Sequence, residues 1–254
     1  MKKFVGGFLM VLALAFVIMP GAALAQKQSG VYIAPRFVYG IVDMGQMQVV
    51  APSGKFKMND DTDSAYGGSF AVGYNFNPKF KVPMRAELEY SAFSKAEGKR
   101  TLRNADNAPT DTAWSKTKQD VGIQTLMVNF YYDEKTSTPL TPYLTAGVGI
   151  AILDSKATED QFEPAFNIGH YARIHSPEET DVNFAWQVGL GLAYDFTPNF
   201  SMDIGYRYMD LGSAKTKKGI STSLLTGNQS PTGAYKKITD VTMHQFHMGA
   251  RYTF

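Results

Sequence analysis

The chain has 254 residues, with 25 basic and 23 acidic side chains and no cysteine. The absence of cysteine excludes a disulfide framework and a thiolate metal site. The near balance of charge argues against a nucleic-acid-binding protein, because such proteins are normally basic. The length suits one domain of ordinary size.

The N-terminus has the features of a secretory signal peptide. Lys2 and Lys3 precede an unbroken apolar run from Phe8 to Ile18, and Ala23-Leu24-Ala25 places small residues where a signal peptidase cleaves. The sequence therefore predicts a cleaved signal peptide at 1–25 and a mature domain at 26–254. An N-terminal membrane anchor is the alternative, but the run is shorter than the ~20 residues of a spanning helix.

The mature chain alternates apolar and polar residues over eight stretches, each long enough to cross a membrane as a tilted strand. Tyrosine, phenylalanine and valine are frequent in them, as in β-strands. The expected strands are Val31–Met44, Ala65–Asn77, Phe80–Ser94, Asp120–Asp133, Leu140–Leu153, Asn183–Phe196, Phe200–Leu211 and Thr239–Phe254.

The connections between these stretches are of two kinds that alternate along the chain. Three are tight and carry turn residues, as in Asn77-Pro78-Lys79 and Thr197-Pro198-Asn199. Outer-membrane barrels have short periplasmic turns and long external loops, and an even number of strands places both termini in the periplasm. Four other segments are long and polar, and we expect external loops there: 45–64, 95–119, 154–182 and 212–238.

The residue types on the two faces indicate which face meets lipid. One face carries bulky side chains such as Phe70, Val128 and Leu190, whereas the other carries small ones such as Gly189 and Ala193. A lipocalin-like soluble barrel would place the apolar face inside, but an eight-stranded barrel has little interior room for so many large residues. The sequence therefore predicts an all-β fold, an eight-stranded antiparallel up-and-down transmembrane β-barrel.

The small face also carries charged residues that would lie in the lumen. We expect Glu87 or Glu89 to pair with Arg207 across the barrel, and Asp203 to lie near Arg251. Such a network could simply plug the barrel, gate a narrow conduit or, least expected, be catalytic. The candidate lumen residues are Arg36, Arg85, Glu87, Glu89, Asp203, Arg207, His247 and Arg251.

The long segments differ in charge: the second and fourth are basic, and the third is acidic. Two interpretations remain open. The charges could compensate one another, or the basic segments could bind lipopolysaccharide phosphates or acidic host glycans. The candidate residues for an anionic ligand are Lys99, Arg100, Arg103, Lys215, Lys217, Lys218, Lys236 and Lys237.

Catalytic and metal-binding patterns are weak. The spacing of His170 and His175 fits a zinc site poorly, and His244 and His247 point to opposite faces of one strand. No Gly-x-Ser-x-Gly elbow, phosphate-binding loop or His-Glu-x-x-His run occurs. We therefore expect a non-enzymatic protein without cofactor or metal, active in envelope integrity, surface recognition or adhesion. A narrow channel for small solutes is the alternative.

Three segments resemble the opacity-type surface antigens, whose barrels are similar to the transmembrane domain of outer-membrane protein A. They are the final strand from Met243 to Phe254, the segment Thr141–Gly149 and the segment Gln187–Tyr194. The resemblance implies an outer-membrane barrel, with Tyr252 and the terminal Phe254 as the signal for the barrel-assembly machinery. The expected partners of the protein are outer-membrane lipid, lipopolysaccharide, the barrel-assembly machinery and host or environmental surface ligands. We expect a monomer.

Overall fold

The computed structural model describes residues 29–52, 54–57, 61–103, 114–165 and 168–254. The predicted signal peptide lies outside the described residues. Among the described residues, no helix is long and apolar enough to cross a membrane.

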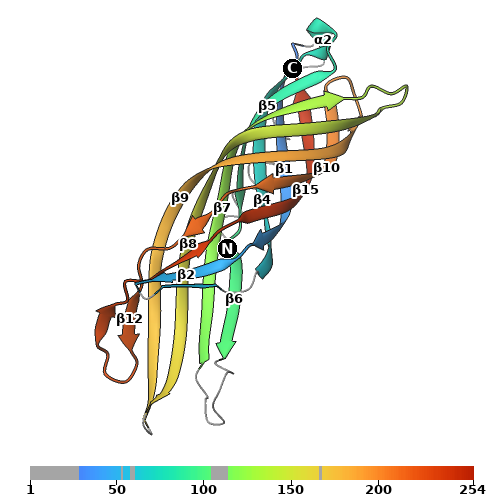
Figure 1. Cartoon of the computed structure of the whole chain (residues 1–254). Coiled ribbons are helices and arrows are strands. Elements are labelled where there is room, and N and C mark those ends of the chain that lie inside the picture. Colours follow the sequence, from blue (N-terminus) through green and yellow to red (C-terminus); the bar gives the residue numbers. More distant parts are fainter. Residues whose placement is uncertain (1–28, 53, 58–60, 104–113, 166–167) are drawn as a thin grey trace.

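Eight antiparallel strands form a closed ring, as predicted (Figure 1). Each strand pairs with the next one in the ring, and the last strand pairs with both its predecessor and the first. In ring order the strands are β1 (Val31–Met44), β4 (Asp61–Asn75), β5 (Met84–Phe93), β7 (Trp114–Asp133), β8 (Leu140–Ala165), β9 (Ile168–Asp195), β10 (Phe200–Asp210) and β15 (Val241–Thr253).

The tight connections and both described chain ends lie at one rim of the barrel, which we call the turn rim. Here the backbone N–H of Ser29 donates to the carbonyl of Phe254 at 2.6 Å. The predicted strand start at Phe80 is wrong, because Asn77–Phe80 form a one-turn helix, α2, and β5 begins only at Met84. Pro78 suits the first turn of that helix because its missing N–H has no intrahelical partner there.

In their described parts, all four long segments contain β-strands, which corrects the expectation of external loops. Strands β7, β8 and β9 continue past the barrel as one sheet, and β6 (Ala96–Arg103) pairs with β7 (Figure 1). Strand β12 (Ile220–Ser223) joins β9 and pairs with β13 (Gln229–Pro231). In these extensions the buried face carries polar side chains such as Thr117, Gln119 and Ser155, so the apolar alternation that marks a strand in the sequence is lost.

Four short strands form a second sheet, here called the side sheet. It consists of β11, β14, β2 and β3 in that order. One face of this sheet is buried: Met47, Ala214 and Ile238 are 0%, 1% and 0% exposed. Ala214 and Ile238 belong to the same apolar cluster as residues inside the barrel. The side sheet therefore covers the barrel mouth opposite the turn rim. Its strands are β2 (Met47–Ala51), β3 (Gly54–Lys57), β11 (Ala214–Lys215) and β14 (Tyr235–Ile238).

The bulky face of each barrel strand points outward, as predicted. Phe70, Val128 and Leu190 are 42%, 41% and 57% exposed. Aromatic side chains cluster at the turn rim, where Tyr252 contacts Phe254 with ring centroids 5.2 Å apart. Aromatic residues at the ends of membrane-crossing strands are typical of the girdles that lie at the lipid–water interface.

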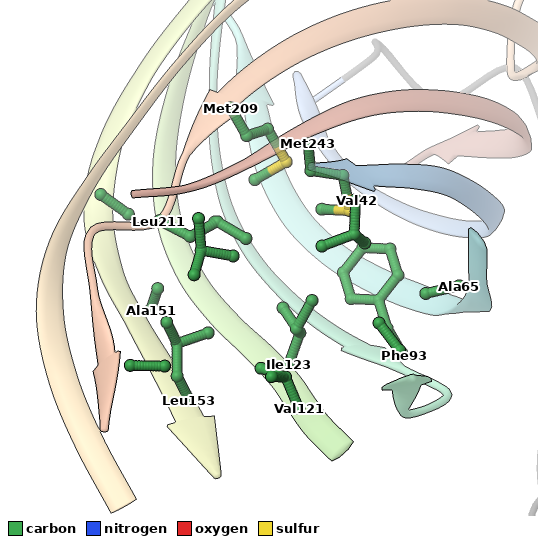
Figure 2. Close-up of a cluster of buried hydrophobic side chains, with 14 of the residues drawn as sticks. Val42, Ala65, Phe93, Val121, Ile123, Ala151, Leu153, Met209, Leu211 and Met243 are labelled. Carbon is green, nitrogen blue, oxygen red and sulfur yellow. The ribbon is translucent and has the colours of Figure 1, made fainter. Parts of the chain in front are cut away.

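The interior consists of two filled layers. Near the turn rim it holds charged and tyrosine side chains, and toward the mouth it holds apolar ones. Figure 2 shows the apolar layer, which includes Ile123, Leu153, Met209 and Met243. The expectation of a small-residue interior is therefore wrong in this layer, because the side sheet excludes water from it.

Inward-facing glycines provide room for the large interior side chains. A β-carbon on Gly205 would lie 2.7 Å from the hydroxyl of Tyr143 and close to the ring of His247. A β-carbon on Gly249 would likewise collide with the Arg36 side chain. The small residues of the inner face thus form the sockets for these bulky residues, rather than lining an open lumen.

The outward face of β9 provides a test of lipid exposure. Val188 lies in the middle of an outward apolar row, whereas Val182 lies at its outer end, and both are exposed at 47% and 63%. We expect Val188→Arg to lower the free energy of unfolding by roughly 2–4 kcal/mol and Val182→Arg by about 0–1 kcal/mol. Urea titration in lipid vesicles measures both values. Equal losses for the two variants would contradict a lipid-facing wall.

Candidate functional site

A buried ion network fills the barrel near the turn rim. Arg36 on β1 lies between two carboxylates of β5, donating to Glu87 at 2.8 Å and to Glu89 at 3.0 Å. Strand β4 separates β1 from β5 in the ring, so these bonds cross the interior rather than run along one sheet pair. All three side chains are at most 2% exposed.

Arg207 on β10 joins the network from the opposite wall. It donates to both oxygens of Glu89, at 2.9 and 3.0 Å, which is the proximity expected from the sequence. It also donates at 2.7 Å to the hydroxyl of Tyr131, and that hydroxyl donates to Glu87 at 2.8 Å. The interaction therefore connects walls that are separated along the ring.

Three interior tyrosines were not among the lumen residues expected from the sequence. Tyr32 donates to Glu87 at 2.9 Å, and Tyr143 donates to Asp203 at 3.1 Å. Tyr32, Tyr131 and Tyr143 are at most 3% exposed. The alternation of faces along a strand could have identified these tyrosines, because residues an even number of positions apart lie on the same face. Tyr32 shares its face with Arg36, and Tyr131 shares its face with Met127 on the inner side.

Asp203 and Arg251 are close enough to interact electrostatically, as expected, but they are not directly opposite each other. In the β10–β15 register, Ser201 lies opposite Arg251, and Asp203 lies opposite Gly249. Asp203 is instead 3.6 Å from Nε of Arg36 and 3.4 Å from Nε2 of His247. The prediction counted from the rim at which β10 begins and β15 ends, but Phe200 pairs with Tyr252 rather than Phe254, so the pairing is offset by two residues.

Arg85 has a separate partner that the sequence analysis did not single out. It makes two bonds to Asp133 at the end of β7, at 2.8 and 2.9 Å, and its guanidinium lies 4.3 Å from the centre of the Tyr131 ring. Paired donation of this kind is the strong geometry for arginine and carboxylate. Asp133 was the predicted end of a strand, where an acid is usually solvated.

The network balances its charges within a closed interior. Buried charges are stable only when they are paired and hydrogen-bonded, and here each of the carboxylates faces an arginine. Among the described residues, no group of three or more histidines and acids is arranged to hold a metal ion. The buried ion pairs connect strands of different walls.

The external basic residues have different environments, and Lys236 is not available to a ligand. It is 2% exposed, and its ammonium lies 2.8 Å from Glu159 on β8. Burial would raise the pKa of Glu159, but Lys236 and hydrogen bonds from Ser115 and Gln161 outweigh it and lower that pKa below its ordinary value. This pair attaches the side sheet to the β8–β9 hairpin.

Other external charges also compensate one another. Asp181 on β9 lies 3.4 Å from Lys215, and Glu178 lies 3.2 Å from Lys95. The acidic third segment thus contacts both basic segments. Lys99 is 3.2 Å from Glu97, Lys217 and Lys218 are exposed, and the side chains of Arg100 and Arg103 lie outside the described part.

The outer surface of the side sheet carries a row of lysines, which we call the lysine face. Lys215 is paired with Lys237, Lys237 with Gln48, and Gln48 with Lys57. Lys55, two residues before Lys57, shares its face. The sequence analysis missed Lys55 and Lys57 because they lie in a segment of balanced charge, although their alternation around Phe56 is a strand signal.

A closed antiparallel ring with an apolar outer wall defines a transmembrane β-barrel. The profile of the outer membrane protein beta-barrel domain matches residues 9–254. Outer membrane protein PagN of Salmonella typhimurium is 30% identical over 247 residues, covering 94% of this chain and 95% of that protein. An uncharacterised protein of Brucella abortus is 26% identical over 211 residues, covering 77% and 71% of the two chains.

The chain belongs to the outer membrane protein β-barrel domain family and is a protein of the bacterial outer membrane. Among solved structures, Neisserial surface protein A is 17% identical, with a TM-score of 0.44 over 90% of this chain and 100% of the other. Outer membrane protein OprG of Pseudomonas aeruginosa is 14% identical, with a TM-score of 0.46 over 89% and 97%. The assembly role of Tyr252 and Phe254 stays a prediction.

Glu89 is the residue through which the ion network can be tested. Glu89→Gln leaves Arg36 and Arg207 without a full counter-charge, and we expect it to lower the free energy of unfolding by roughly 3–5 kcal/mol. Urea titration monitored by tryptophan fluorescence measures this change. Glu97→Gln, which removes an exposed carboxylate, is the control and should leave the midpoint unchanged. Equal midpoints for all three proteins would contradict the role given to the network.

Proposed function

We propose that the protein is a sealed, non-enzymatic barrel that displays β-structure outside the cell for surface recognition. The observation that carries this proposal is the asymmetry of the two rims. One rim has short turns, whereas at the other β7–β9 continue outward and hold a second sheet against the barrel (Figure 1). In this orientation the turn rim and both mature termini face the periplasm.

The lysine face is the surface we propose for recognition. Lys215 lies directly opposite Lys237. Like charges opposite each other destabilise a sheet, so a bound anion would relieve this repulsion. Strands β2, β3, β11 and β14 contain no acidic residue, and Asp181 on β9 compensates only Lys215. Neighbouring strands are ~4.8 Å apart, so the lysines are spaced closely enough to contact several anionic groups of one polymer. Lipopolysaccharide phosphates and acidic glycans have this chemistry.

Binding of dextran sulfate tests the recognition surface. The triple variant Lys55→Gln, Lys57→Gln, Lys237→Gln should bind it about tenfold more weakly than the unmodified protein, since each exposed charge contact contributes modestly. High salt should weaken binding by the unmodified protein. Biolayer interferometry with protein in nanodiscs measures both effects, and uncharged dextran should not bind.

A matched variant distinguishes this surface from total charge. Lys95→Gln, Lys118→Gln, Lys156→Gln removes three lysines from the same external region, but each of these lies near an acid. We expect this variant to bind dextran sulfate like the unmodified protein. Equal losses in the two triple variants would mean that only net charge matters, and the lysine face would have no special role.

The narrow-channel alternative requires a continuous water path, and two filled interior layers argue against it. The ion network closes the inner half, and the apolar cluster closes the outer half beneath the side sheet. We therefore expect no steady conductance when the purified protein is inserted into planar bilayers. Reproducible single-channel steps that disappear with heat-unfolded protein would favour the channel instead.

A further inference from the structure

A polar cavity of about 580 Å³ opens at the turn rim, on the side opposite the lysine face. It lies between the three tight connections, and its walls include Asn75, Lys81, Lys135, Asp195, Ser201 and Arg251. Deeper in the barrel, Arg85 and Asp133 pair with each other and are 1% and 3% exposed. The cavity is therefore blind, and a ligand could enter it only from the turn rim.

Arg251 forms the floor of the cavity, and the ion pair that the described residues offer it is a long one. Its side chain is 10% exposed, and its closest acidic atom is an oxygen of Asp195 at 3.6 Å, beyond hydrogen-bond length. Its guanidinium lies 5.7 Å from the centre of the Tyr32 ring, which supports it from the inner side. A guanidinium has five donors, and here it lines a cavity that is open to a ligand.

The charge around the cavity is positive. Lys81, Lys135 and Arg251 line it against the single carboxylate of Asp195. Asp195 is shared, since Lys135 also lies 3.8 Å from it. Lys81 has a left-handed backbone, with φ of 60°, which follows the one-turn helix α2 and fixes this residue at the rim. One acid therefore cannot satisfy the three cations that surround the space.

We propose that this cavity is a binding site for a small anion, a carboxylate or a phosphate, held by Arg251 with Lys81 and Lys135 at the entrance. A planar guanidinium can bind either group through two parallel hydrogen bonds. The Ser201 hydroxyl adds a neutral donor on the same wall. Because the cavity is at the rim opposite the lysine face, this site does not depend on the proposed recognition of polyanions.

Isothermal titration calorimetry of the full barrel in detergent micelles tests the proposal, with inorganic phosphate and acetate as separate probes. We expect saturable binding of at least one probe, with a stoichiometry of one. Arg251→Gln should weaken it by about tenfold or more, since it removes a charge-assisted pair of bonds. Binding of phosphate alone or acetate alone supports the site and identifies the class of its ligand.

Two further variants keep the test decisive. Lys81→Gln with Lys135→Gln changes only rim residues, so it is informative even if Arg251→Gln does not fold, and it should weaken binding roughly threefold. Lys79→Gln is the matched control, because Lys79 lies in the same turn but does not line the cavity; it should bind normally. Absence of saturable binding for both probes, or unchanged affinity in the rim double variant and in Arg251→Gln, would overturn the proposal.

Discussion

The pairing of charges across the barrel interior is the interaction on which the rest of the structure depends. Arg36 and Arg207 approach Glu89 from different walls, so a single carboxylate holds together strands that are not neighbours in the ring. The backbone hydrogen bonds of a sheet fix only adjacent strands. The buried pairs fix the distances across the lumen, because an arginine or glutamate left alone there would be strongly unfavourable.

This constraint separates the two ends of the molecule. The filled interior lies between the proposed recognition surface at one rim and the proposed anion site at the other. The external rim is built on paired strands and held by the Lys236–Glu159 contact, so the lysine face lies on a supported sheet rather than on a free loop. The turn rim instead contains a blind cavity above Arg251.

Large and small residues alternate inside for the same reason. Tyr143, His247 and Arg36 are bulky for an eight-stranded barrel, and they fit because Gly205 and Gly249 provide no side chain of their own. The abundance of glycine on the inner face thus reflects complementary packing. The interior is filled despite these glycines, because large neighbouring side chains occupy the space beside them.

The sequence alone determined the barrel, its eight strands, the outward face and most of the inward charges, because alternation along a lipid-facing strand is recorded residue by residue. The sequence could also place Glu89 near Arg207. Only the tertiary structure decided that Asp203 contacts Arg36 and that Lys236 is buried beside Glu159. These depend on strand register and on contacts between distant segments, where a shift of two residues changes the partner without changing the pattern. The same holds for the external strands, whose buried face carries polar residues such as Gln119 and Ser155 and therefore shows little apolar alternation in the sequence.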